Sequence, residues 1–149
     1  MATITEFELP STGNRTFKLT DARGKKLVVY FYPKDDTPGC TVEGSDFRDL
    51  YTEFKQHDCE IVGISRDDLQ SHEKFKAKLS LPFELLSDAD EKVCELFGVM
   101  KLKNMYGKEV RGVDRSTFVL DANGKQIKEW RSVKSVGHAQ EVLDTVKTL

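Results

Sequence analysis

The chain has 149 residues, of which 38% are hydrophobic, and this length suits one compact domain, residues 1–149, with a core of its own. Charged residues make up 32% of the sequence but nearly cancel to a formal net charge of -2, which argues against a nucleic-acid partner. No apolar run is long enough to span a membrane, and the opening MATITEFELP lacks the basic and apolar regions of a secretory signal, so a cytoplasmic protein is expected.

The first half of the chain predicts a strand, a helix, a second strand and a second helix. The run KKLVVYFYP, residues 25–33, is apolar, β-branched and aromatic, which is typical of a buried strand. A helix is predicted over residues 37–55, because four apolar residues recur there at the spacing of one helical face: Phe47, Leu50, Tyr51 and Phe54. CEIVGIS, residues 59–65, predicts the next buried strand, and DLQSHEKFKAKLS, residues 68–80, a more polar helix. The order indicates a parallel β-α-β unit.

The second half predicts a short helix, a hairpin and a last helix. DADEKVCELFG, residues 88–98, is expected to form a helix that ends at Gly98 and has one apolar face made of Ala89, Val93, Leu96 and Phe97. STFVLDANGKQIKEW reads as two strands joined around Asn123 and Gly124. The segment GHAQEVLDTVKTL predicts a helix that aligns Ala139, Val142, Leu143 and Val146. This order predicts an α/β protein with a thioredoxin-like fold, in which helices flank a central mixed β-sheet.

The three cysteines, Cys40, Cys59 and Cys94, are too few and too widely spaced for a disulfide scaffold or a metal site. We therefore expect no metal and no cofactor, and any redox chemistry must start from single thiols.

The stretch YPKDDTPGCTVEG, residues 32–44, places one of these thiols at a predicted helix start. Thr37 suits the N-cap, Pro38 the first helical position, and Gly39 allows a close approach of the backbone. Cys40 then falls in the first helical turn, where free N–H groups and the helix dipole favour an anion. The sequence thus predicts a thiolate-forming cysteine whose sulfur points inward, to the floor of a pocket.

Thiolate formation alone does not make a fast catalyst. If the substrate is a peroxide, attack on one oxygen breaks the O–O bond and drives negative charge onto the other, which needs fixed hydrogen-bond donors. Thr37 offers a hydroxyl and the helix start offers N–H groups. Arg115, in GVDRSTFVL, precedes a predicted core strand that could bring it beside the strand ending at Pro33.

These residues resemble a known family. Pro33, Thr37 and Cys40 match the P-x-x-x-T-x-x-C pattern of peroxiredoxins, and Arg115 matches their active-site arginine. The string YPKDDTPGCTVEG is similar to the Q-type subgroup, the bacterioferritin comigratory proteins, and the likeness extends through LPFELLSD, YGKEV and RSTFVLDANGK. The resemblance implies that hydrogen peroxide or an alkyl hydroperoxide oxidises Cys40 to a sulfenic acid. It also implies a supporting role for Glu43, which would orient the arginine.

The sequence departs from the family at the resolving cysteine. The two positions that usually hold it carry Ser45 and Lys76. Cys59 is predicted to be a core residue, and Cys94, at the edge of an apolar helical face, is either a packing residue or the resolving cysteine. We therefore expect a one-cysteine cycle with an external thiol reductant: thioredoxin, glutaredoxin or glutathione.

Three alternatives stay open at this stage. Cys94 as resolving residue would make an atypical two-cysteine peroxidase. A redox sensor or binding module of the same fold would oxidise without turnover. Relatives in the subgroup are often monomers, so a monomer is expected, with a weak dimer as the alternative.

The remaining polar and aromatic candidates are assigned structural roles. His57, His72 and His138 are predicted to lie on the surface, and the lysine-rich KLKNMYG segment is predicted to be a solvated loop. Trp130 is assigned to packing.

Overall fold

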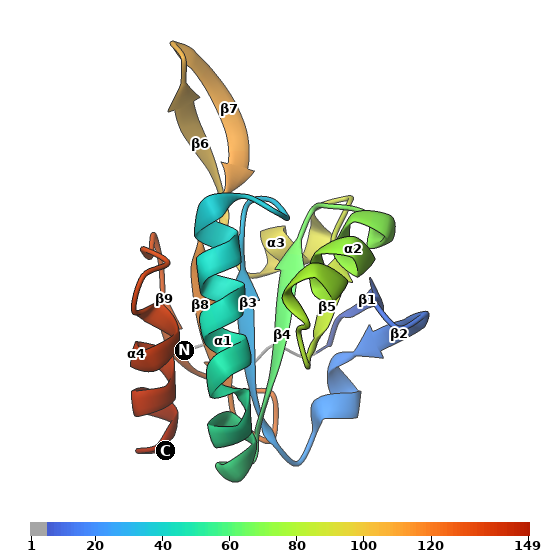
Figure 1. The fold of residues 1–149 in the computed structure, drawn as a ribbon, viewed down its shortest axis with the longest axis vertical. Helices are drawn as coiled ribbons and strands as arrows, with labels where there is room; N and C mark the ends of the chain where they lie inside the picture. The colour runs from blue at the N-terminus through green and yellow to red at the C-terminus, as the bar shows by residue number, and fades with distance from the viewer. Residues whose placement is uncertain (1–5) are drawn as a thin grey trace.

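The computed structural model describes residues 6–149, so the first five residues of the opening MATITEFELP lie outside the described part. Its main sheet has seven strands in the order β2-β1-β5-β4-β3-β8-β9 (Figure 1). Their bounds are Glu8–Ser11 (β1), Arg15–Lys18 (β2), Lys26–Phe31 (β3), Cys59–Ser65 (β4), Glu84–Ser87 (β5), Ser116–Leu120 (β8) and Gln126–Trp130 (β9). β3, β4 and β5 are parallel neighbours, while β8 pairs antiparallel with β3, so the sheet is mixed.

The position of the central strand β3 explains why its sequence is apolar throughout. It lies between β4 and β8, and all of its residues from Leu27 to Phe31 are buried. A strand covered on both faces has no polar side to show, so its sequence is continuously hydrophobic rather than alternating. At its upper end in Figure 1, Phe31 pairs with Ser116 of β8, which places the residue before Ser116 at the same edge of the sheet.

Helices cover both faces of this sheet, and each face has its own core cluster. The helices α1 (Pro38–Gln56), α2 (Leu69–Leu79) and α4 (His138–Val146) pack with Val28 and Tyr30 of β3. The 3-10 turn η1 (Leu19–Ala22) and the short helix α3 (Lys92–Leu96) pack with Val29 and Phe31. Alternate residues of one strand thus point into different clusters, as strand geometry requires. The thioredoxin-like arrangement of a mixed sheet between helices is confirmed.

The KLKNMYG segment is not a loop. It forms most of β6 (Met100–Met105) and the turn to β7 (Lys108–Val113), and the two strands make an antiparallel sheet that projects from one end of the molecule in Figure 1. The strands are joined at Tyr106 and Gly107, which both have positive φ, as a two-residue hairpin turn requires. The prediction was wrong because the many lysines hide the alternation on which strand recognition relies.

The short helix α3 has a different buried face from the predicted one. Val93, Cys94 and Phe97 are buried, whereas Leu96 is half exposed and Ala89 lies outside the helix on the surface. The reason is local, because the carboxylate of Asp88 accepts hydrogen bonds from the backbone N–H groups of Val93 and Cys94 and so delays the helix start. The predicted spacing was counted from a residue that is not helical.

Two of the three histidines are also buried, contrary to the prediction. His72 is fully buried and His138 nearly so, whereas His57 is partly exposed at the end of α1. Each buried ring has hydrogen-bond partners for both nitrogens. Within residues 6–149, none of the helices is both long and apolar enough to cross a membrane.

Candidate active site

The start of α1 has the geometry that the sequence predicted. Asp36 adopts a left-handed backbone conformation with φ 61°, and Thr37 follows in extended conformation as the N-cap. Pro38 opens the helix, and Cys40 is its third residue, only 2% exposed. The Thr37 hydroxyl donates a hydrogen bond to the Lys34 carbonyl at 2.8 Å, which keeps its oxygen lone pairs available as acceptors.

Arg115 reaches this thiol from the other half of the chain. Its Nη2 lies 3.4 Å from Cys40 Sγ, and its Nη1 donates to Glu43 Oε1 at 2.7 Å. Arg115 directly precedes Ser116, whose pairing with Phe31 places it at the edge of the sheet where β3 ends and the chain turns toward α1. Pro33, half-buried, follows β3 at that edge. All five sequence candidates, Pro33, Thr37, Cys40, Glu43 and Arg115, therefore lie at one end of the sheet.

Glu43 is buried against the arginine in an unusual electrostatic setting. It is fully buried, and its Oε2 has no hydrogen-bond partner. Burial raises the pKa of Glu43 to about 7, although the charge and hydrogen bond of Arg115 act in the opposite direction. Burial alone would lower the pKa of Arg115, but the charges of Glu43 and Cys40 raise it above its ordinary value. The guanidinium thus stays charged between a carboxyl group and a thiol.

Gly39 leaves room for this guanidinium. A Cβ built at position 39 would stand 3.0 Å from Arg115 Nη2 and 3.6 Å from Ser135 Oγ. A larger residue would push the arginine away from the sulfur. Sequence reasoning missed Ser135, which carries no motif; its loop is joined to the site where the Val133 N–H donates to the Arg115 carbonyl at 3.0 Å.

The loop that contains Ser135 also lines a surface hollow. The hollow has a volume of about 440 Å³, and its walls include Trp130, Val136 and His138. Val136 is 80% exposed, so the wall contributed by this loop is partly apolar. Cys40 does not line this hollow, but the loop that does also brings Ser135 close to Gly39.

The other two cysteines belong to the core of the protein. Cys59 and Cys94 are fully buried, and Cys94 belongs to the core cluster on the opposite face of the sheet from Cys40. Burial raises the pKa of Cys59 to about 12. Burial first, and then the hydrogen bond to Asp88, raise the pKa of Cys94 well above that of an ordinary thiol. Cys59 is the core residue that the sequence predicted.

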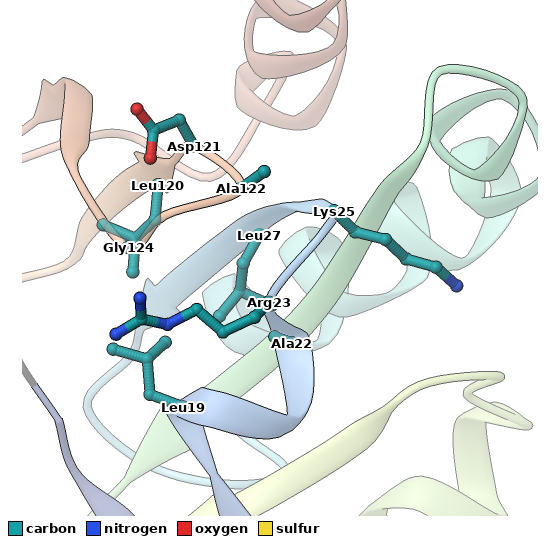
Figure 2. Close-up of a pocket in the computed structure, with 9 residues that line it drawn as sticks. All are labelled: Leu19, Ala22, Arg23, Lys25, Leu27, Leu120, Asp121, Ala122 and Gly124. Carbon is teal, nitrogen blue, oxygen red and sulfur yellow. The ribbon is translucent and has the colours of Figure 1, made fainter.

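A second, much smaller pocket lies at the opposite end of β3 (Figure 2). Side chains of η1, β3 and the β8–β9 turn line it, including Leu19, Leu27 and Leu120. Its volume of about 10 Å³ is close to the minimum needed for one water molecule, so it cannot be a substrate site.

A thioredoxin-like fold with a buried cysteine at a helix start and an arginine beside its sulfur defines a thiol peroxidase. The chain matches the model of the AhpC/TSA family over residues 2–128. It belongs to that family, and within it to the peroxiredoxins of the Q or bacterioferritin comigratory type. Like other peroxiredoxins, it reduces a peroxide at the expense of a thiol reductant.

Several relatives support this membership. Peroxiredoxin Bcp of Bacillus subtilis is 49% identical over 144 residues, which cover 97% of this chain and 92% of the relative. The structure of the bacterioferritin comigratory protein of Xanthomonas campestris, described in terms of alkyl peroxide reduction, is 47% identical with a TM-score of 0.91 and covers 95% of this chain and 90% of its own. PrxQ of Xylella fastidiosa is 40% identical with a TM-score of 0.94, covering 99% and 94%.

Proposed function

We propose that Cys40 is the peroxidatic cysteine, and that Arg115 stabilises both its thiolate and the departing oxygen. The sulfur attacks one peroxide oxygen, an S–O bond forms, and the O–O bond breaks. The second oxygen leaves with the bonding electron pair and takes up a proton to become water or an alcohol, while Cys40 becomes a sulfenic acid. The 3.4 Å contact between Arg115 Nη2 and Cys40 Sγ is the observation that carries this proposal.

Thr37 and Pro33 complete the proposed site. Since the Thr37 hydroxyl already donates to the Lys34 carbonyl, its oxygen is free to accept the hydroxyl hydrogen of a hydroperoxide. Pro33 follows β3 at the same edge of the sheet and has no N–H group, so it adds no competing donor there. Glu43 holds the guanidinium in place through its 2.7 Å hydrogen bond and is assigned a supporting role.

We propose hydrogen peroxide and alkyl hydroperoxides as substrates. The X. campestris relative is described in terms of alkyl peroxide reduction, and the hollow beside Ser135 offers this chain a partly apolar surface for an alkyl group. A Val136→Asp variant tests whether the hollow contacts the alkyl group, through its rates with hydrogen peroxide and with cumene hydroperoxide.

A one-cysteine cycle fits the positions of the thiols best. Cys40 and Cys94 belong to core clusters on opposite faces of the sheet, so a disulfide between them, whose Cα atoms must lie within about 7 Å, would require much more than unwinding one helical turn. We propose instead that an external thiolate, from thioredoxin, glutaredoxin or glutathione, attacks the sulfenic sulfur and releases water. A second thiol then breaks the mixed disulfide and restores the Cys40 thiol.

The replacement of Cys94 by alanine should therefore leave peroxide turnover within about twofold of the wild-type rate when thioredoxin or glutaredoxin is supplied, since only a buried packing residue is lost. After one equivalent of peroxide, peptide mapping should find a dimedone adduct on Cys40. Cys59→Ala is the matched control for loss of a buried thiol. A dominant Cys40–Cys94 disulfide, with turnover lost in Cys94→Ala alone, would make this an atypical two-cysteine enzyme.

Glu43→Gln should flatten the pH dependence of stability. Because the pKa of Glu43 is about 7 in the folded chain and about 4.3 when unfolded, the folded state keeps a proton that the unfolded state loses. The contribution of this group to stability is thus fully present below about pH 4 and is lost as pH rises through about 7, by up to about 4 kcal/mol at about 1.4 kcal/mol per pKa unit.

The measurement is the free energy of unfolding in urea between about pH 5 and about pH 8. Wild-type stability should fall more steeply with pH than that of the glutamine variant, which has no proton to lose. Glu53→Gln, on the exposed side of the same helix, is the control. Parallel pH profiles for the wild type and Glu43→Gln would contradict the assignment of a proton to Glu43.

We also propose that residues 1–149 act as a single domain and as a monomer, because Cys40, Glu43 and Arg115 come together within one chain. A reducing compartment such as the cytoplasm suits its three free cysteines and its need for a thiol donor. Sedimentation equilibrium tests the monomer.

A further inference from the structure

The loop between β3 and α1 is tied to α2 through the buried carboxylate of Asp35 and, at the surface, through the ion pair of Asp36 with Lys78. Asp35 is 6% exposed, and both of its oxygens accept hydrogen bonds. Oδ1 accepts from the Tyr32 hydroxyl at 2.6 Å, and Oδ2 accepts from the Ser71 hydroxyl at 2.8 Å. The backbone N–H of Asp35 donates to Asp67 Oδ2 at 2.8 Å. Asp35 is thus the buried anchor of the residues between Pro33 and Thr37.

The imidazole of His72 completes this anchor, and its surroundings indicate its protonation state. Its Nε2 lies 2.9 Å from the Leu86 carbonyl oxygen, which can only accept, so Nε2 carries a hydrogen. Its Nδ1 lies 2.6 Å from Asp35 Oδ2, so a second proton must lie between these atoms. Burial alone would raise the pKa of Asp35, but the hydrogen bond and charge of His72, with the hydrogen bonds from Tyr32 and Ser71, bring it below its usual value. The hydrogen bonds that Asp35 accepts thus favour its carboxylate form.

We propose that Asp35 and His72 form a buried ion pair that positions the catalytic loop, holding Thr37 and the start of α1 in register with Arg115. Neither residue touches the reacting sulfur in the described structure, so they are positioning residues. The inference rests on the proposed role of Cys40, because it concerns the geometry presented to that thiol. It assigns a function to Asp35, which stands at an unspecified position of the P-x-x-x-T-x-x-C pattern, and to His72, which lies outside that pattern.

The path from the pair to the reaction is short. Asp35 is followed by Asp36, whose left-handed backbone reverses the chain, and then by Thr37, the N-cap of α1. The charged residues near the pair are Asp67 on the β4–α2 connection, and Asp36, Lys74 and Lys78, which line one surface pocket with Asp35; the Tyr32 hydroxyl faces it as a neutral donor. Asp35, Asp67 and His72 also bring ligand-type atoms within 4.8 Å of one another. We do not assign a metal there, because both Asp35 oxygens and both ring nitrogens of His72 already have hydrogen-bond partners.

The test compares Asp35→Asn, His72→Gln and the double variant. Each single change leaves one buried charge without its partner and frees the loop, whereas the double change removes both charges and restores a neutral hydrogen-bonded pair. Because small displacements of catalytic groups lower rates by up to about 100-fold, we expect each single variant to react with hydrogen peroxide roughly 10- to 100-fold more slowly. The double variant should be faster than either single variant.

Two readouts separate positioning from stability. Stopped-flow oxidation by peroxide should slow in the single variants, while alkylation of Cys40 by iodoacetamide, which needs only an accessible thiolate, should change less than about threefold. His57→Gln, at the far end of α1, is the matched control and should keep both rates. Wild-type peroxide rates in both folded single variants, or losses that simply multiply in the double variant, would overturn the proposal.

The charge assignment is tested without any variant. Nitrogen NMR of the ¹⁵N-histidine-labelled wild-type protein at neutral pH should show protons on both ring nitrogens of His72. A neutral imidazole would overturn the ion pair even if every variant failed to fold. Failure of the Cys40 assignment would be recognised separately, as peroxide reduction that persists in Cys40→Ser.

Discussion

Replacement of Cys40 by serine should abolish peroxide reduction, with a loss of at least about 10³-fold in the second-order rate constant. A serine hydroxyl is almost wholly protonated at neutral pH, and its oxygen is a far poorer nucleophile toward a peroxide than a thiolate sulfur. The substitution replaces the sulfur atom by oxygen with little change in volume, in a side chain that is 2% exposed. Hydrogen peroxide consumption with excess thiol reductant measures the effect.

Cys59→Ser is the control, because Cys59 is a buried thiol with no contact to the site. That variant should keep its catalytic rate, although a buried hydroxyl lowers its stability by roughly 1–3 kcal/mol. Substantial turnover by a pure Cys40→Ser protein would remove the central assignment.

Arg115→Ala should have the second largest effect, a decrease of roughly 10²- to 10³-fold in the rate of Cys40 oxidation. Arg115 Nη2 is 3.4 Å from Cys40 Sγ, so its removal takes away a cation beside the attacking sulfur and a donor for the departing oxygen. Glu43 then loses the cation that opposes its protonation, so it stays neutral near pH 7 and the variant should still fold.

Two measurements separate these contributions. The pH dependence of Cys40 alkylation reports the thiolate, and stopped-flow oxidation at a pH where the thiolate is fully formed reports stabilisation of the departing oxygen. Arg111→Ala is the matched control, because that arginine pairs with Glu91 and Glu95 away from the thiol. If Arg115→Ala reacted with peroxide as fast as Arg111→Ala, the arginine would have no part in the reaction.

Short-range patterns predicted the central elements well. The run that became β3 and the segment CEIVGIS that became β4 are continuous apolar stretches, and the helix at Cys40 begins with its cap and proline in consecutive positions. Apolar runs and helix caps depend on residues that are close in sequence, so tertiary packing does not change what they predict. The strands β1, β2 and β5 were not predicted, since each has only four residues and too little pattern to recognise.

The buried histidines show a different limit. His72 lies in a polar helix, and nothing nearby in sequence indicates that its ring meets Asp35, 37 residues earlier, and the carbonyl of Leu86, 14 residues later. A polar side chain is buried when a partner satisfies it, and that partner is supplied by sheet order and helix packing.

The same distinction applies to the site. The sequence alone determined that Cys40 stands in the first turn of a helix behind Thr37 and Pro38, because caps and helix dipoles act within a few residues. Only the tertiary structure decided that Arg115, 75 residues away, reaches its sulfur, because this contact depends on β8 pairing with β3. It also places Cys94 on the opposite face of the sheet from Cys40, through packing between elements that no local pattern encodes.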